Sequence, residues 1–369
     1  MPDPNEAVRK LLDSLVGDGP EVGLQACAYL GGKQVINCWS GVADPESGQQ
    51  VDGRSMFTVF SCSKGVTATC IHMLADRGKL DYDDPICKYW PEFAAKGKEK
   101  ATIRHALTHR VGVPQTPPGV AITDWEGMTK GLAEEAPRWE PGTKSGYHGS
   151  TYGWILGEVL RRIDGRHIQQ FLQEEVCRPL GIDSMYFGVP AAEEHRVGRL
   201  IDGPPLPEDA TARRYLRNIM VSPQFNTSAV RQAELPAHGG IMSAAAIARH
   251  YAMLAQGGEL DGTRLLSPER VRIASELQFD GVDVTLEQPV RRGLGYALGG
   301  LAGGGMDAVS GRPNAFGHSG LGGALGFADP EREFAFGITK NFMERNDPSQ
   351  EQEKTASIVC RKVEQALGI

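Results

Sequence analysis

Ser61 and Lys64 are a pair of side chains in this 369-residue chain whose types and spacing suit covalent chemistry. A serine hydroxyl is a weak nucleophile near neutral pH, so it needs a neighbouring base and donors for the oxyanion that develops. A three-residue spacing at the start of a helix places both side chains on one face, and the helix N-terminus directs free N–H groups toward Ser61. A buried, neutral Lys64 can accept a proton. The pair predicts acyl transfer through Ser61.

Two further segments can complete such a site. Tyr147 stands in GTKSGYHGSTYGW, at a junction between a loop and a helix, and a phenol near an ammonium and a serine can shuttle a proton to a leaving group. The run Gly317-His318-Ser319-Gly320-Leu321-Gly322-Gly323 lies near the C-terminus, and glycines within a strand indicate that a backbone or a ligand lies close. Tyr147 and His318 could instead have purely structural roles. A Ser-x-x-Lys spacing alone also arises by chance.

The elements that must position Ser61 begin with β structure. Residues 22–30 and 34–42 predict a hairpin, because two strand-like runs are separated by a short glycine-containing turn. The strand-like run at 56–60 leads directly into Ser61. Apolar residues at helical spacing then predict a helix over 64–80. The nucleophile is therefore expected between a strand and a helix.

The middle of the chain is expected to be mainly helical. Amphipathic patterns predict helices over 151–163 and 167–177, joined by connections rich in proline and glycine. Strand signals return over 314–340, which we interpret as a hairpin, and 350–367 predicts a closing amphipathic helix.

These patterns predict two regions. Residues 1–79 and 236–369 would form an α/β sandwich, and 80–235 would form a mainly helical insertion. The connections 112–145 and 202–235 are long for a compact domain, and such loops usually border a site.

Composition excludes several classes of function. The chain has 40% hydrophobic and 23% charged residues, which is typical of a globular protein. Its net charge of −7 gives no basic face for nucleic acid, and no apolar run is long enough to span a membrane. The N-terminus has no leader pattern, so we expect a cytoplasmic protein. Seven scattered cysteines without zinc spacing predict reduced thiols, no metal and no cofactor; the oligomeric state stays open.

The three candidate segments, in this order and at these separations, resemble the serine β-lactamase and penicillin-binding-protein superfamily, particularly class C β-lactamases and family VIII carboxylesterases. The resemblance covers about residues 20 to 345. Its supporting stretches are LDYDDPICKYWPEF, TIRHALTHRVGVP, WEPGTKSGY, LPAHGGIMSAAAIARHYAML and GHSGLGGALGFADP. It implies an α+β fold of the β-lactamase/DD-peptidase type. An antiparallel sheet built from both chain termini would be flanked by helices, with a mainly helical region inserted and the active site between them.

The resemblance also implies a role for each candidate residue. Ser61 matches the nucleophile, Lys64 its partner, and Tyr147 the tyrosine of the second motif. His318-Ser319-Gly320 matches the third motif, which contacts substrate. The oxyanion hole would be formed by the backbone N–H groups of Ser61 and Leu321.

Two departures from class C β-lactamases concern the substrate. The second motif there ends in asparagine, whereas Gly149 stands here, so the amide that would contact an acylamido side chain is missing. The third motif there begins with lysine, whereas His318 is a weaker, pH-dependent cation. Both differences favour neutral esters over β-lactams.

We therefore expect a carboxylesterase that acts on a small-molecule ester through an acyl-enzyme on Ser61. Which of Lys64 and Tyr147 is the formal base stays open. The alternatives are a β-lactamase or D-amino-acid peptidase of the same fold, an acyltransferase, or a non-catalytic interaction protein. An α/β-hydrolase is disfavoured, since no Gly-x-Ser-x-Gly elbow exists.

Other residues are interpreted more plainly. His105 and His109 have metal-ligand spacing, but no glutamate lies between them as in HExxH, so we expect structural roles. Ser63 is expected to pack rather than react. Trp125 and Trp139 precede Tyr147 and either line an acyl pocket or anchor their loop.

Overall fold

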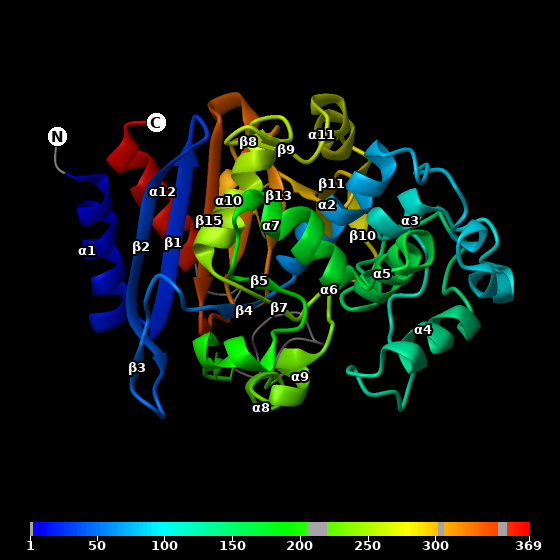
Figure 1. Cartoon of the computed structure of the whole chain (residues 1–369), viewed down its shortest axis with the longest axis horizontal. Coiled ribbons are helices and arrows are strands. Elements are labelled where there is room, and N and C mark those ends of the chain that lie inside the picture. Colours follow the sequence, from blue (N-terminus) through cyan, green and yellow to red (C-terminus); the bar gives the residue numbers. More distant parts are fainter. Residues whose placement is uncertain (1–2, 206–219, 302–305, 346–352) are drawn as a thin grey trace.

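The computed structural model of the chain describes residues 3–205, 220–301, 306–345 and 353–369 (Figure 1). Parts of the predicted connection 202–235 and of the predicted helix 350–367 therefore lie outside the described residues. No helix in the described part is long and apolar enough to cross a membrane.

The largest sheet of the described residues has nine strands in the order β10-β11-β12-β13-β14-β15-β1-β2-β3. Every neighbouring pair in it is antiparallel. Because β1 pairs with β15, the sheet joins the two ends of the chain, which confirms the predicted fold class. The strands are β1 (Gly23–Leu30), β2 (Lys33–Asp44), β3 (Gln49–Gln50), β10 (Phe279–Asp283), β11 (Gln288–Arg292), β12 (Ala297–Leu298), β13 (Phe316–Ser319), β14 (Leu325–Asp329) and β15 (Phe334–Lys340).

Helices cover both faces of this sheet (Figure 1). Successive side chains of a strand point to opposite faces, so Leu24 and Ala26 pack with α1 (Pro4–Gly17) and α12 (Thr355–Leu367), whereas Cys27 faces the other core. On that second face, α10 (Ala244–Ala255) packs against β1, β14 and β15.

The predicted insertion is mainly helical, as expected, with a few short strands. The division into two regions stays a prediction, because one continuous buried cluster contains residues of both. The remaining helices are α2 (Ser63–Asp76), α3 (Ile103–Leu107), α4 (Trp125–Glu134), α5 (Thr151–Asp164), α6 (Ile168–Phe171), α7 (Arg178–Leu180), α8 (Ser222–Phe225), α9 (Ser228–Gln232) and α11 (Pro268–Ser275). The remaining strands are β4 (Phe57–Phe60), β5 (Met185–Tyr186), β6 (Ile201–Asp202), β7 (Gly240–Met242), β8 (Glu259–Leu260), β9 (Thr263–Arg264) and β16 (Phe342–Met343).

Several local predictions are confirmed and two are corrected. The first hairpin turns at Gly31 and Gly32, both with positive φ, as a tight turn requires. The segment 314–340 is not one hairpin but three strands, because it contains a second turn in which Glu333 has a φ of 50°. The predicted helix 167–177 is α6 followed by a π-helical turn over Leu172–Cys177.

The strand before Ser61 belongs to a second sheet, with the order β4-β7-β5. The inserted region contributes β5, and the segment after it contributes β7. Three distant parts of the chain therefore form the sheet that contains β4, the strand before Ser61.

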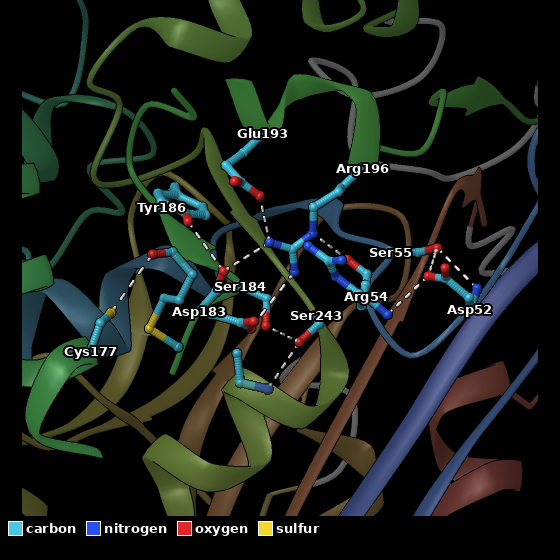
Figure 2. A network of polar contacts seen from close by, with 12 residues as sticks. Asp52, Arg54, Ser55, Cys177, Asp183, Ser184, Tyr186, Glu193, Arg196 and Ser243 are labelled. Carbon is cyan, nitrogen blue, oxygen red and sulfur yellow. Dashed lines mark hydrogen bonds and ion pairs between the residues drawn. The ribbon is translucent and has the colours of Figure 1, made fainter. Parts of the chain in front are cut away.

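A buried arginine ties this second sheet together (Figure 2). Arg196 is 5% exposed; its guanidinium donates to the carbonyl oxygens of Arg54 at 2.9 Å and Asp183 at 3.1 Å, and to the carboxylate of Glu193 at 2.7 Å. Arg54 precedes β4 and Asp183 precedes β5. The side chain therefore links the starts of β4 and β5, the two outer strands of this sheet.

We predict that Arg196→Met lowers the free energy of unfolding by about 3 kcal/mol, because it leaves three part-buried acceptors without their donor. Chemical denaturation measures this change. The matched control is Arg199→Met, since Arg199 is 38% exposed and pairs with the exposed Glu46. Equal stability of the two variants would contradict this role of Arg196.

Candidate active site

Ser61 lies between β4 and α2, at the N-terminal end of the helix. The preceding residue, Phe60, has a φ of 46°, a conformation that costs a non-glycine residue about 1 kcal/mol or more and is typical of functional sites. Ser63 stabilises this turn: its hydroxyl donates to the carbonyl oxygen of Phe60 at 2.5 Å and accepts from the N–H of Gly240 at 2.9 Å. Ser63 is therefore a structural serine, as expected.

Lys64 extends from the first turn of α2 to Ser61 and is fully buried. Its Nζ lies 3.0 Å from Ser61 Oγ, 2.7 Å from the carbonyl oxygen of Gly149 and 2.9 Å from that of Ala237. Burial, together with the positive charge of Arg292, holds the pKa of the amine well below 10.5. The neutral amine is thereby favoured.

Tyr147 approaches Ser61 from the loop before α5. Its hydroxyl lies 2.7 Å from Ser61 Oγ, and Lys64 Nζ lies 4.8 Å from the centre of its ring. Ser61 and Tyr147 are partly exposed, whereas Lys64 is closed off from solvent. A molecule entering from solvent can therefore reach the serine and the phenol, but not the amine.

The third predicted segment is β13 and the turn after it. Cys62, at the start of α2, donates through Sγ to the carbonyl oxygen of His318 at 3.1 Å, which joins this strand to the nucleophile turn. A side chain at Gly320 would collide with the carbonyl oxygen of Val59 on β4. Glycine at 320 is therefore required for β13 to pass so close to Ser61.

The N–H groups of Ser61 and Leu321 have no acceptor among the described residues. The N–H of Gly320 donates to the carbonyl oxygen of Ala324 at 2.7 Å. This bond closes the turn and leaves Leu321 at its exposed tip. Two free N–H groups on segments packed together at Ser61 are what an oxyanion hole needs.

His318 differs from its predicted character as a pH-dependent cation. It is 8% exposed, and burial lowers its pKa to about 3. It is neutral near pH 7. Its Nδ1 lies 2.7 Å from the carbonyl oxygen of Ser319, which can only accept, so Nδ1 carries the proton and Nε2 is an acceptor.

The histidines and tryptophans near the site are structural. His105 caps α3 through Thr102, and His109 accepts from the N–H of His148 at 3.1 Å. Trp125 donates to Glu158 on α5 at 3.1 Å. The described residues contain no group of three or more histidine, cysteine or acidic side chains that could hold a metal ion.

Trp139 lies against the backbone just before Tyr147. A side chain at Gly146 would collide with its ring, and the ring meets His148 edge-on at 6.0 Å. This packing anchors the loop that contains Tyr147.

Four residues that contact the site were not predicted from the sequence. The carbonyl groups of Gly149 and Ala237 hold Lys64, but a backbone carbonyl has no residue type that could mark it. Asp283 accepts the N–H of Tyr147 at 3.0 Å and pairs with Arg292. No motif includes these two residues, and no predicted helix or strand contains them, so the sequence offered no signal for either.

This arrangement contains the parts of a covalent acyl-transfer site. It brings together a partly exposed hydroxyl, a buried amine, a phenol and two free N–H groups, all within the same small region. The described residues that match the family motifs in sequence therefore also meet in space.

The chain is similar in sequence and in fold to proteins that are already known. The model of the Beta-lactamase family matches residues 8–359. The esterase/beta-lactamase LipL of Mycobacterium tuberculosis is 34% identical over 336 residues, which cover 85% of this chain and 75% of LipL. A crystal structure of a family VIII carboxylesterase superimposes with a TM-score of 0.87 at 31% identity, covering 99% of this chain and 98% of that one.

A penicillin-binding protein homologue from Caulobacter crescentus superimposes with a TM-score of 0.84 at 30% identity, covering all of this chain and 97% of that one. Two solved structures, with carboxylesterase and penicillin-binding names, thus share the whole fold. The match of the family model over nearly the full length decides the classification. The chain belongs to the beta-lactamase family.

Proposed function

We propose that this protein is a serine esterase that hydrolyses carboxylic esters of small molecules through an acyl-enzyme on Ser61. The observation that carries the proposal is the buried Lys64 amine, 3.0 Å from Ser61 Oγ. The names of the M. tuberculosis relative and of the solved carboxylesterase support the same reaction class.

The surroundings of Lys64 favour it as the base. A neutral amine has two N–H groups and one lone pair. The carbonyl oxygens of Gly149 and Ala237 can only accept, so they take the two hydrogens, and the lone pair is left for the hydroxyl of Ser61. Lys64 then takes the serine proton as Oγ attacks the ester carbonyl carbon.

The remaining steps use the other groups of the site. The N–H groups of Ser61 and Leu321 stabilise the oxyanion of the tetrahedral intermediate. As the C–O bond breaks, Tyr147 gives its proton to the leaving alcohol oxygen and regains one from Lys64. Water then attacks the acyl-enzyme; its proton returns through the same groups to Ser61 Oγ, and the carboxylic acid leaves.

Two positions favour esters over β-lactams. His318 is neutral, and its outer nitrogen is an acceptor, so it cannot donate to the carboxylate that a β-lactam carries. Gly149 has no amide to contact an acylamido group. The M. tuberculosis relative is named an esterase/beta-lactamase, so β-lactam hydrolysis is a second candidate activity of the same site. Transfer of the acyl group to another alcohol would use the same acyl-enzyme.

We also propose that the enzyme works in the cytoplasm. All seven cysteines are described, all are free, and six are buried. Free thiols are typical of a reducing compartment.

Ser61→Ala is expected to lower kcat for short p-nitrophenyl esters by about 10³-fold or more, because the acylated atom is lost. It should also abolish labelling by a fluorophosphonate probe, with circular dichroism unchanged. Ser63→Ala is the matched control, which loses stability but is still labelled at Ser61. Substantial ester hydrolysis by Ser61→Ala would refute the proposed function.

Gly149→Asn tests the substrate preference. A Cβ at this position would lie 3.8 Å or more from its neighbours, and the backbone there is not left-handed, so the substitution is accommodated. We expect kcat/KM for a benzylpenicillin-type substrate, relative to an ester, to rise about tenfold through the restored hydrogen bond. Gly149→Ala, which adds the Cβ without the amide, should leave the ratio unchanged. An equal ratio in both variants would contradict this explanation.

A further inference from the structure

A buried pair of opposite charges, Asp283 and Arg292, lies beside Tyr147 and belongs to no motif of the site. The two side chains are 0% and 7% exposed and form an ion pair. They come from the end of β10 and the end of β11, whose strands pair with each other at the edge of the nine-stranded sheet. Isolated charges are expensive to bury, so a fully enclosed pair next to a proton relay requires an explanation.

Asp283 fixes the backbone of Tyr147. Its Oδ1 accepts N–H groups from Tyr147 at 3.0 Å, Thr285 at 2.9 Å and Leu286 at 2.8 Å. The N–H of Val284 also donates to the carbonyl oxygen of Ser145, at 2.8 Å. The turn after β10 is thereby attached to the loop of Tyr147. The three N–H groups also offset much of the carboxylate charge.

Arg292 provides a positive charge close to the phenol. Its guanidinium carbon lies 5.6 Å from the centre of the Tyr147 ring, and its Nε has no hydrogen-bond partner among the described residues. A cation at this distance in a poorly hydrated site favours the phenolate form of a tyrosine and the neutral form of a lysine. After burial, the charge of Arg292 is the next cause that lowers the pKa of Lys64.

The positive charge of Arg292 matters because His318 is neutral. The resemblance to class C β-lactamases leads to the expectation of a lysine at position 318, and the histidine here does not replace its charge. We propose that Arg292, oriented by Asp283, is a positioning residue that supplies from β11 the positive charge of the proton relay. The proposal rests on the proposed function, since it concerns the same Ser61 chemistry.

The titratable groups around Tyr147 and Arg292 come from every element packed against them. They are Lys64 of α2, His109 after α3, His148 before α5, Tyr152 at the start of α5, Asp283 at the end of β10 and His318 of β13. Burial lowers the pKa of His148 to about 4 and that of His109 well below 6.5. Near pH 7 these histidines are neutral, so they do not supply the missing charge.

The decisive variant is the double substitution Asp283→Asn with Arg292→Met. It removes both charges, so no isolated charge stays buried, and the amide oxygen of asparagine can still accept the N–H of Tyr147. Arg292→Lys keeps the charge. Arg291→Met is the matched control, because Arg291 lies on the same strand but faces the other side, near Asp280 and the carbonyl oxygen of Gly299.

The measurements are the pH profiles of kcat/KM for a p-nitrophenyl ester and of the rate of fluorophosphonate labelling. Without the cation, Lys64 and Tyr147 hold their protons to higher pH, so the acidic limb should move up by about one pH unit in the double variant. Arg292→Lys and Arg291→Met should keep the wild-type limb.

A folded double variant with the wild-type acidic limb in both profiles would overturn the proposal, whatever its rate. A uniform loss of rate without a pH shift would do the same, since it indicates a structural role alone. The proposed function fails separately, through an active Ser61→Ala variant. The two failures are therefore distinguishable.

Discussion

The burial of one amine sets the chemistry of this site. Lys64 Nζ is enclosed with two carbonyl oxygens and the hydroxyl of Ser61, and none of these neighbours is an anion. An ammonium there would lose its hydration without gaining a counter-ion, so the neutral form is stabilised. The positive charge of Arg292 also lowers the pKa of Lys64. In the proposed reaction this side chain, which is a cation in water, acts as the base.

The fold brings this environment together from distant segments. Ser61 and Lys64 come from the start of α2, Gly149 from the loop before α5, and Ala237 from the segment before β7. Close packing needs special backbone at the junctions, which accounts for the positive φ of Phe60 and for glycine at 320. The strained backbone of Phe60 persists because the packing of the surrounding sheets fixes its conformation. The geometry of the site therefore depends on the packing of the whole fold.

The sequence indicated the candidate residues whose proposed roles depend on their type. Ser61, Lys64, Tyr147 and the His318 segment carry recognisable motifs, and the structure brings them together. It could not predict the carbonyl groups around Lys64, since these belong to residues of no particular type. The charge of His318 was predicted wrongly, because burial is a property of the folded chain. Likewise, the sheet β4-β7-β5 depends on pairings between segments far apart in sequence, which local patterns do not encode.

The protonation state of Lys64 can be observed directly by neutron diffraction from a deuterium-exchanged crystal grown near neutral pD. Our account predicts two deuterons on Nζ, directed at the carbonyl oxygens of Gly149 and Ala237, and a deuteron on Ser61 Oγ directed at Nζ. Three deuterons on Nζ would contradict it, because the amine would then be a cation unable to take the proton of Ser61.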